Sequence, residues 1–486
     1  MSDHEFGPLL LAGHWREGSE SATTAVENPA DESVIARVSV ASVTDVETAV
    51  VEAHRAQSAW ASTPTVERAA VLYRLAELVE RDRERLAAIV VSEVGKPVTE
   101  ARGEVDGAAG YCRFFAGIAT VQGGDILPSA RRDSEVWIRR EPVGVVGAII
   151  PWNFPLALTT RKLAPALVAG NAVVLKPAEI TPLSALAIAA LAIEAGVPAG
   201  LLSVLPGPGS VVGAALVSTP GVGLITMTGS VGAGRSIMRG AAERIIPVSL
   251  ELGGKAPFVV FDDVDLDEAV EAAVATRMLN NGQTCVCNER TFVQKSVYED
   301  FVSRYVARVN SLSVGDPTLD STDVGPKVSR PELENVERIV DAAVAAGATV
   351  SLGGSRLSGG IFDRGHWYAP TVLTDLAADS PVLREEVFGP VTPIVPFDDE
   401  AHAVALANDT AYGLSSYLFT NDFSRVMRFT RAVRSGEVFV NRTGPEEVNG
   451  FHSGWGESGL GGDDGTRGLS LYTRTQTVYA GWEAQS

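Results

Sequence analysis

VGVVGAII, residues 143–150, is the first of five short apolar segments that decide the fold. Helix-like sequence fills each gap between these segments. Strands with so few polar residues, alternating with helices, are typical of a parallel sheet that is covered on both faces. The pattern therefore predicts a doubly wound α/β domain, whose ligand should lie outside the carboxyl ends of the strands. The other four segments are Asn171–Lys176, Leu201–Leu205, Gly223–Thr228 and Pro247–Leu252.

Helix-end residues mark the clearest helix of this region. Thr181 stands where an N-cap is expected, Pro182 follows at the first helical position, and Gly196 comes just past the end. Each residue type is favoured at that place in a helix. Earlier in the chain, residues 45–120 are predicted to be mostly helical, because residues 66–75 repeat apolar side chains at helical spacing.

A second alternation of strands and helices follows the first. It begins at Phe258–Phe261 and continues to the strand Glu437–Val440. Its first helices are expected near Leu266–Leu279 and Tyr298–Leu312. The sequence therefore predicts a second α/β domain.

Two strand-like segments fit neither domain. Glu135–Arg140 and Leu471–Tyr479 both alternate in polarity and are rich in Arg or Thr. Paired edge strands of this kind often make subunit contacts. A simple surface hairpin explains the same pattern equally well.

Net charge and cysteine content argue against several classes of function. The 486 residues include 40 Lys and Arg against 60 Asp and Glu, a net charge of −20, which repels nucleic acid and anionic membranes. The acidic opening Met1–Glu5 does not resemble a signal peptide, so we expect a cytoplasmic protein. Three cysteines cannot form a disulfide framework, and without a Cys/His cluster we expect no metal site. A working cysteine would act as a free thiol.

One thiol stands in a setting that suggests chemistry. Cys285 ends the run Asn281-Gly282-Gln283-Thr284-Cys285, near the end of a helical segment, where a side chain can face a cleft. Cys287 lies two residues further on, and local composition does not separate the two. Cys112 stands among aromatic residues and is interpreted as a buried apolar side chain.

A carboxylate precedes this thiol by about thirty residues. Glu251 ends an apolar strand and is followed by Gly253-Gly254, so the backbone can pass close to a ligand. Burial there would raise the pKa of Glu251 toward the range of a general base. The alternative is a strand-end carboxylate that turns to solvent. A thiol that attacks a carbonyl and a base that activates water can together convert an aldehyde to an acid through a thioester.

Two further strand ends carry polar motifs. In Pro151-Trp152-Asn153-Phe154-Pro155 two prolines stiffen a turn in which the amide of Asn153 could donate to an oxyanion. A turn that merely packs aromatic rings is the alternative, and the rarity of the pentapeptide favours the functional interpretation. In Lys176-Pro177-Ala178-Glu179 the carboxylate of Glu179 could accept both ribose hydroxyls and would repel a 2′-phosphate, which favours NAD over NADP. A solvated Lys/Glu pair is the alternative there.

Glycine-rich runs follow two more strands. Gly207-Pro208-Gly209 with Gly213 beyond it, and Thr228-Gly229-Ser230-Val231-Gly232, each lead toward a helix. Helix N-termini preceded by glycine are natural phosphate sites. Neither run has the G-x-G-x-x-G spacing, so each is a weak signal by itself.

These motifs, found in this order together with Glu386-Val387-Phe388-Gly389-Pro390, resemble the NAD(P)-dependent aldehyde dehydrogenase superfamily over nearly the whole chain. The resemblance implies an NAD-binding domain of residues 1–122 and 144–251 and a catalytic domain of residues 252–464. It also implies a small β arm for oligomerisation, residues 123–143 and 465–486, and a homodimer or homotetramer.

The resemblance implies a role for each site residue. Cys285 is the nucleophile, Asn153 and the Cys285 backbone N–H form the oxyanion hole, Glu251 activates water, and Lys162 relays protons. The reaction would run through thiolate attack, hydride transfer to the nicotinamide of NAD, hydrolysis of the thioester and release of the acid. The presence of Glu251 favours hydrolysis over acyl transfer to coenzyme A. The residues that would hold the cofactor are Ile149, Ile150, Pro151, Trp152, Lys176, Glu179, Gly209, Gly213, Ser230, Leu252, Glu386 and Phe388.

The substrate site resembles that of bacterial lactaldehyde and glycolaldehyde dehydrogenases. In that subgroup an Arg, a Glu and a His surround a small hydroxylated aldehyde, and these fall here on Arg161, Glu446 and His452. An arginine at that place is costly unless an oxygen-rich substrate or a carboxylate satisfies it. Phe154 is also assigned to the substrate site, while Thr443–Pro445 and Glu457 depart from the subgroup pattern.

The expected function is therefore NAD-dependent oxidation of lactaldehyde or glycolaldehyde, small-molecule substrates. A sugar-aldehyde dehydrogenase, for example one acting on an anhydro-sugar, is the alternative within the superfamily. A thiol esterase or a catalytically silent binding protein on the same fold also stays open.

Overall fold

The five apolar segments form the parallel centre of an eight-stranded sheet in the computed structural model, which describes residues 7–121 and 123–483. The strand order is β19-β11-β10-β7-β8-β9-β1-β2, and the strands at both edges pair antiparallel to their neighbours. The central strands are β7 (Val145–Ile149), β8 (Ala172–Lys176), β9 (Leu202–Val204), β10 (Val222–Thr228) and β11 (Val248–Glu251), and the edge strands are β1 (Leu9–Leu11), β2 (His14–Arg16) and β19 (Gly459–Leu460).

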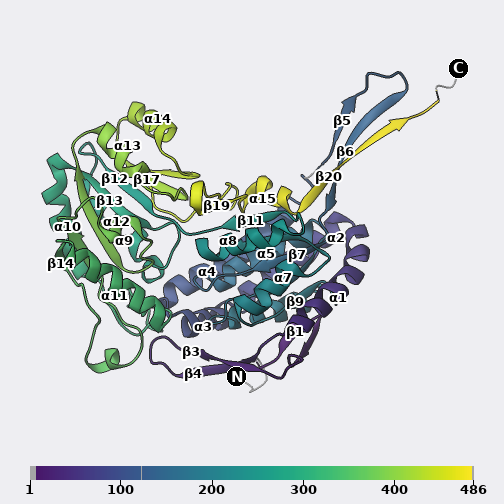
Figure 1. The fold of residues 1–486 in the computed structure, drawn as a ribbon, viewed down its shortest axis with the longest axis horizontal. Helices are drawn as coiled ribbons and strands as arrows, with labels where there is room; N and C mark the ends of the chain where they lie inside the picture. The colour runs from purple at the N-terminus through teal and green to yellow at the C-terminus, as the bar shows by residue number, and fades with distance from the viewer. Residues whose placement is uncertain (1–6, 122, 484–486) are drawn as a thin grey trace.

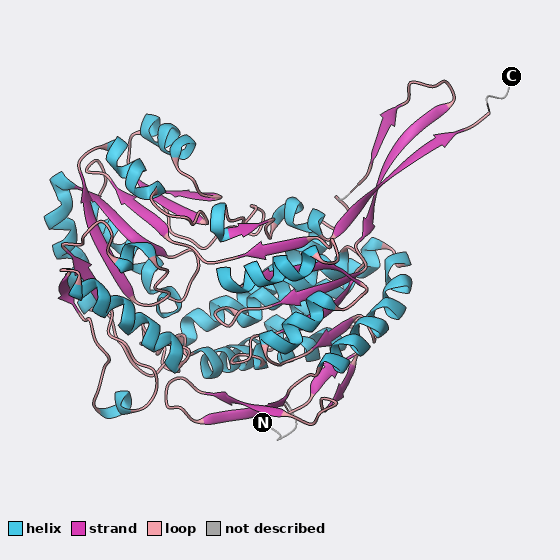
Figure 2. Cartoon of the chain, in the orientation of Figure 1, coloured by secondary structure: helices cyan, strands magenta, loops and turns pink. Residues whose placement is uncertain are grey.

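Helices cover this sheet (Figures 1 and 2). Residues 45–120 are mostly helical, as predicted, and the last helix of this region packs along the helix that follows β7. Apolar side chains of the strands and helices form one continuous buried core. The helices are α1 (Val43–Ser62), α2 (Thr65–Arg81), α3 (Arg83–Val94), α4 (Val98–Gly117), α5 (Pro155–Val168), α6 (Leu183–Glu194), α7 (Ala214–Ser218) and α8 (Val231–Ala242).

The predicted N-cap of α6 is wrong. Pro182 precedes the helix, and the N–H groups of Leu183 and Ser184 donate to the buried carboxylate of Glu93, at 2.8 and 2.9 Å. A side chain about ninety residues earlier in the chain therefore satisfies the donors that Thr181 was expected to cap. The predicted end is correct, because Gly196 follows the C-cap with a positive φ of 94°.

The second alternation forms a seven-stranded sheet of order β14-β15-β16-β13-β12-β17-β18, parallel except at β14. Together the two sheets confirm the predicted pair of α/β units. The strands are β12 (Ala256–Val260), β13 (Asn288–Gln294), β14 (Thr349–Leu352), β15 (Thr371–Thr374), β16 (Val391–Phe397), β17 (Ser415–Phe419) and β18 (Glu437–Val440). The helices are α9 (Leu266–Met278), α10 (Tyr298–Asn310), α11 (Arg330–Ala345), α12 (Pro381–Arg384), α13 (Glu400–Asn408) and α14 (Phe423–Ala432).

The two strand-like segments that fit neither sheet pair with each other. β6 (Ser134–Pro142) lies between β5 (Asp125–Pro128) and β20 (Thr473–Gly481) in an antiparallel sheet that projects from the body (Figure 1). A short helix, α15 (Gly465–Leu471), leads into β20 and contacts α5. A separate antiparallel pair, β3 (Thr23–Glu27) and β4 (Val34–Ser39), lies near the start of the chain.

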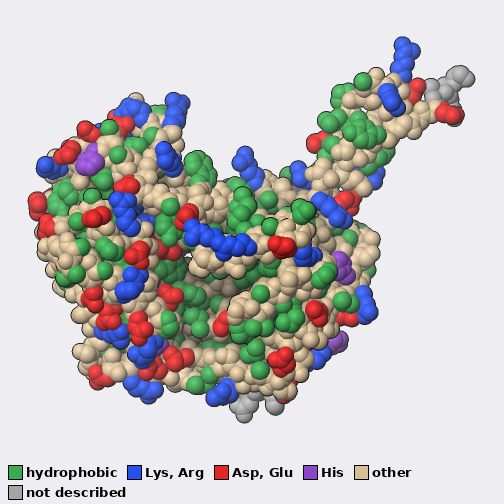
Figure 3. All heavy atoms as spheres, in the orientation of Figure 1, with side chains coloured by type: hydrophobic (Ala, Val, Ile, Leu, Met, Phe, Trp, Pro, Cys, Tyr) green, Lys and Arg blue, Asp and Glu red, His purple; other side chains and the backbone are tan. Residues whose placement is uncertain are grey.

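The chain returns to the first sheet after it has built the second. β19 pairs with β11 in the register Leu250 to Leu460 and Glu251 to Gly459. This pairing holds residues 452–464 beside the end of β11, between the two lobes, where the molecular surface is hollowed (Figure 3). Within residues 7–121 and 123–483, no helix is both long and apolar enough to cross a membrane.

Candidate active site

The turn before Cys285 is held in an unusual backbone conformation. Asn280, Asn281 and Gly282 have positive φ angles of 52°, 59° and 74° in succession. Such angles are rare for residues with a side chain, so local bonds must hold them. The Asn280 amide donates to the carbonyl of Asn153 at 2.8 Å, and the Asn281 amide donates to that of Pro326 at 2.8 Å. These bonds fix the turn that carries the thiol.

Burial separates the three cysteines. Cys112 and Cys287 are fully buried, which confirms the interpretation of Cys112, while Cys285 is partly accessible. Burial raises the pKa of Cys287 to about 12, and its sulfur accepts a hydrogen bond from Arg277 at 3.1 Å. Burial also raises the pKa of Cys285, but a hydrogen bond with His452 opposes that effect. Cys285 is the better placed nucleophile.

The turn after β7 brings Asn153 to the thiol turn. The Nδ2 atom of Asn153 donates to the carbonyl of Gln283 at 3.2 Å, two residues before Cys285. Its Oδ1 atom is buried and has no hydrogen-bond partner among the described residues. A buried amide this close to the thiol is within reach of a developing oxyanion.

Glu251 is a buried carboxylate at the end of β11. It is 2% exposed, so the alternative in which it turns to solvent is wrong. Burial raises its pKa to about 8, and within the described part of the chain neither carboxylate oxygen accepts a hydrogen bond. Its Oε2 atom lies 3.4 Å from Nε2 of His452. The carboxylate can therefore accept a proton near neutral pH.

The three residues assigned to the substrate lie together. Nη1 of Arg161 is 2.8 Å from Oε1 of Glu446, which lies 3.8 Å from Nδ1 of His452. Because His452 contacts both Glu251 and Cys285, these residues form one continuous group with the thiol. Burial and Arg161 oppose the charge on His452, but the carboxylates of Glu446, Glu437 and Glu251 raise the pKa of His452 well above its usual value.

More charged residues surround this group than the sequence analysis named. Lys162 is fully buried and lies 2.9 Å from Asp463, and Arg161 pairs with Asp464 through two nitrogens. Potential metal-ligand atoms of Glu437, Glu446 and His452 lie within 4.8 Å of one another, a spacing that could hold a metal ion. The paired carboxylates are Glu251, Glu437, Glu446, Asp463 and Asp464, and the cations are Arg161, Lys162 and His452.

Phe154, which is predicted to belong to the substrate site, lies beside a buried ion pair. The ammonium of Lys96 lies 3.6 Å from the centre of its ring, and Lys96 pairs with Glu104 at 2.6 Å, both fully buried. Glu104 in turn accepts the N–H groups of Leu156 and Ala157, at 2.9 and 3.2 Å. Sequence analysis missed this pair, because neither a charged residue between two helices, such as Lys96, nor one on an amphipathic helix, such as Glu104, shows from sequence whether it is buried.

The residues assigned to the nucleotide sugar gather at the ends of β8 and β9. Glu179 is exposed and accepts the N–H of Gly209 at 2.7 Å. Lys176 is buried, which lowers its pKa to about 8, and its side chain runs past Gly213. Ile150 joins the group through its N–H, which donates to the carbonyl of Lys176 at 2.9 Å.

A cleft of about 750 Å³ lies between the lobes. Ser230 lines it and caps α8, a helix of 12 residues whose N-terminal N–H groups suit a phosphate. Glu386 lines the opposite side and accepts the N–H of Gly254 at 2.8 Å. A side chain at Gly253 would collide with Glu386, since an added Cβ would lie 2.3 Å from its carboxylate.

Two aromatic residues assigned to the cofactor, Trp152 and Phe388, pack against each other. The rings of Trp152 and Phe388 meet edge to face with centres 5.3 Å apart. Leu252 packs against Gly234 of α8, and Ile149 and Pro151 are half-buried beside Trp152. An exposed carboxylate at the end of β8, a helix N-terminus that lines the cleft and apolar side chains near the thiol turn are the groups that a dinucleotide cofactor needs.

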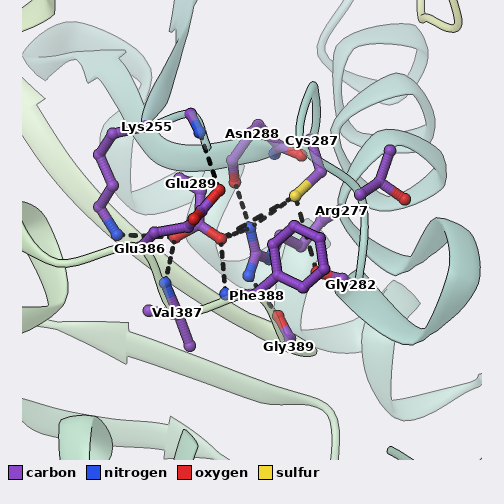
Figure 4. A network of polar contacts seen from close by, with 12 residues as sticks. Lys255, Arg277, Gly282, Cys287, Asn288, Glu289, Glu386, Val387, Phe388 and Gly389 are labelled. Atoms are coloured by element: carbon purple, nitrogen blue, oxygen red, sulfur yellow. Dashed lines mark hydrogen bonds and ion pairs between the residues drawn. The ribbon is translucent and has the colours of Figure 1, made fainter. Parts of the chain in front are cut away.

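Sequence analysis also missed a buried network (Figure 4). It contacts the loop of residues 386–390, which is here called the cofactor loop because Glu386 and Phe388 are assigned to the cofactor. Glu289 lies 2.7 Å from Lys255 and 2.9 Å from Arg277, and accepts the N–H groups of Val387 and Phe388 at 2.9 and 3.0 Å. Burial opposes the charge, but the two cations and the N–H donors hold the pKa of Glu289 at about 2. Because β13 is mostly polar in sequence, no local signal indicated that Glu289 would be buried.

Arg277 also links this network to the thiol turn. It donates to the carbonyl of Gly389 and to the sulfur of Cys287. The backbone of the cofactor loop and the turn that carries Cys285 are therefore held by one set of side chains. Cys287 and Arg277 therefore have a structural role beside the site.

A partly accessible thiol, a buried carboxylate and a buried amide beside a nucleotide-sized cleft define a thiol-dependent oxidoreductase site. The family comparison agrees with this class. Residues 15–478 match the model of the aldehyde dehydrogenase family, and the chain belongs to that family.

Individual relatives span nearly the whole chain. A 3,6-anhydro-alpha-L-galactose dehydrogenase from Streptomyces coelicolor is 50% identical over 97% of this chain and 95% of its own. A lactaldehyde dehydrogenase from Escherichia coli is 40% identical over 97% of this chain and 98% of its own. A solved 3,6-anhydro-L-galactose dehydrogenase in complex with NAP (NADP) has a TM-score of 0.96 at 40% identity, over 97% of this chain and 99% of its own.

Proposed function

We propose that the protein oxidises a neutral, hydroxylated aldehyde to its carboxylic acid, and that an anhydro-sugar aldehyde is the better candidate for the substrate. The observation that carries the proposal is the continuous group that runs from Cys285 through His452 and Glu446 to Arg161. Its polar side chains suit hydroxyl groups, whereas an apolar aldehyde would leave them unsatisfied. The relative at 50% identity favours the sugar aldehyde, and lactaldehyde or glycolaldehyde is the second candidate.

In the first half of the reaction the thiolate of Cys285 attacks the carbonyl carbon of the aldehyde. The oxyanion formed receives hydrogen bonds from Nδ2 of Asn153 and from the backbone N–H of Cys285. The Nδ2 atom of Asn153 carries two N–H groups, so one can keep the 3.2 Å bond to Gln283 while the other donates to the oxyanion. His452 supports the thiolate, because its positive charge opposes the effect of burial on the pKa of Cys285.

NAD or NADP supplies, when bound, the hydride acceptor that converts the adduct into a thioester on Cys285. Glu251 then removes a proton from water, and the resulting hydroxide attacks the acyl carbon. The thiolate leaves as the acid forms. Lys162 and Asp463, 2.9 Å apart and buried beside the site, form a proton relay. The carboxylic acid product leaves as an anion.

The cofactor preference rests on Glu179. Its carboxylate is exposed at the end of β8, where it repels a 2′-phosphate, so we infer a preference for NAD. The NADP-bound relative keeps the second cofactor open. Comparing kcat/KM for NAD and NADP measures the preference directly.

The test compares 3,6-anhydro-L-galactose, L-lactaldehyde and glycolaldehyde as substrates, with reduced cofactor measured by absorbance. We expect oxidation of all three, with the highest kcat/KM for the sugar aldehyde. Cys285→Ala should abolish turnover, whereas the matched Cys287→Ala should keep it. If Cys287→Ala lost turnover while Cys285→Ala kept it, the assignment of Cys285 as the nucleophile would be wrong. Ester hydrolysis without formation of any reduced cofactor would support a thiol esterase.

A further inference from the structure

The charge of Arg161, a residue of the predicted substrate trio, is already paired on several sides. Nε of Arg161 donates to Oδ1 of Asp464 at 3.0 Å, and Nη2 donates to the other oxygen of the same carboxylate. Nη1 lies 2.8 Å from Glu446, and the ring of Tyr111 faces the guanidinium at 5.4 Å. A planar guanidinium held in this two-pronged way has little capacity left for another anion.

The loop that carries Asp464 is firmly held. The neighbouring Asp463 exchanges two backbone hydrogen bonds with His452, at 3.0 and 2.8 Å, so the loop is tied to a residue of the site. Asp464 has a φ of 69°, a strained value for a residue with a side chain, which its bond to Arg161 helps to maintain. Burial raises the pKa of Asp464 to about 6 against the effect of Arg161, so the carboxylate is charged at and above neutral pH.

The two carboxylates change what Arg161 can recognise. An arginine that was free in this site would attract an aldehyde with a second, anionic end. Glu446 and Asp464 instead leave a substrate carboxylate to meet two negative charges in a buried, low-dielectric place. A neutral hydroxyl group can still accept from Arg161 or donate to Glu446.

We propose that Asp464 is a specificity-determining residue: by pairing with Arg161 it makes the site select neutral aldehydes and reject those that carry a carboxylate. This inference rests on the proposed function, since it concerns the substrate class of the same site. Asp464 acts through Arg161. It is therefore expected to control the KM for an anionic aldehyde more than the turnover of a neutral one.

The experiment uses two probe aldehydes of similar size, succinic semialdehyde and its neutral amide, 4-oxobutanamide. The wild-type enzyme should favour the amide in kcat/KM. Asp464→Asn should raise kcat/KM for succinic semialdehyde by about tenfold to a hundredfold, the range for a hydrogen bond to a charged group, mainly through KM. The value for the amide should change less than about threefold.

Two variants test the cause. Arg161→Gln combined with Asp464→Asn should lose the gain, because the cation that would bind the substrate carboxylate is gone. The control is Glu447→Gln, which removes the charge of the exposed carboxylate next to Glu446, paired with Arg442 at 3.2 Å. It should leave the ratio of the kcat/KM values for the two probes unchanged. Thermal unfolding shows whether each variant is folded.

Equal use of both probes by the wild-type enzyme overturns the inference without any variant. So does an Asp464→Asn enzyme that is folded but still rejects succinic semialdehyde. The proposed function fails separately, when none of 3,6-anhydro-L-galactose, L-lactaldehyde and glycolaldehyde is oxidised. The two probes still report charge selection in that case, because they do not depend on the natural substrate.

Discussion

Burial turns Glu251 into a base that works near neutral pH. Its pKa of about 8 arises chiefly from loss of water, which His452 partly offsets. Only the deprotonated form can take a proton from water, so the hydrolysis step should speed up as the pH rises through about 8. In acid the carboxyl group stays protonated and the thioester should accumulate.

Glu251→Gln should separate the two halves of the reaction. The amide cannot accept the proton, and loss of a general base lowers the rate by about 10²- to 10⁴-fold. One turnover of reduced cofactor should still form as a burst, because Cys285 remains. Rapid-mixing absorbance measures the burst and the steady state over a series of pH values. Steady turnover near the wild-type rate would contradict the role of Glu251.

The choice between Cys285 and Cys287 shows a limit of sequence reasoning at the residue scale. Both thiols lie in one short run, and the surrounding sequence does not distinguish them. Their difference arises from Arg277, on α9, and from His452, far along the chain. Contacts of that kind follow from the tertiary fold, and here only the family resemblance indicated the choice.

At the scale of elements, α4 joins the two turns of the site. Glu104 accepts the first N–H groups of α5, which continues from the Asn153 turn. Glu100, one turn earlier on α4, accepts the N–H of Asn280 at 2.7 Å. One helix therefore holds the oxyanion turn and the thiol turn in register.

Glu104→Gln should destabilise this arrangement. It leaves the fully buried Lys96 without its charged partner, which costs about 3–5 kcal/mol of the free energy of unfolding. Urea denaturation measures the loss. Glu84→Gln, on an exposed carboxylate of α3, should change stability by less than about 1 kcal/mol. The double replacement Lys96→Met with Glu104→Leu should recover part of the loss, and no recovery would argue against an unpaired charge as the cause.

Strands were easier to predict than the ends of helices. Each predicted strand of the first sheet is a short, mainly apolar segment, as burial on both faces requires. The start of α6 was missed because Glu93 takes the place of a local cap. The Glu289 network was missed because the partners of Glu289 come from α9, the segment before β12 and the loop after α12.

At the scale of the whole molecule, the site exists because the chain crosses between two sheets. β19 falls within the segment 252–464 proposed as the catalytic domain, yet it lies on the edge of the first sheet. The pairing brings His452 and Asp463 to Glu251 and Lys162. The proposed NAD-binding segment, residues 1–122 and 144–251, and the proposed catalytic segment thus both contribute residues to one reaction site.

The projecting arm, β5, β6 and β20, is proposed to make the contact between copies of the chain. Ile126 is 72% exposed and Tyr479 is 79% exposed, and such apolar side chains on a projecting sheet are typical of an interface. We expect a homodimer or homotetramer. Ile126→Glu combined with Tyr479→Glu should produce a monomer, because charges placed in the contact would lose water without gaining partners.

Light scattering after size exclusion measures the mass of each form. Val66→Glu places the same charge on an apolar residue of α2 that is 62% exposed, away from the arm, and should leave the mass unchanged. A wild-type protein that is monomeric at micromolar concentration would refute the proposal, as would a double variant that keeps the wild-type mass. Because the site residues lie between the lobes rather than on the arm, each monomer should keep its thiol, base and cofactor cleft. The monomeric variant is therefore expected to retain measurable turnover.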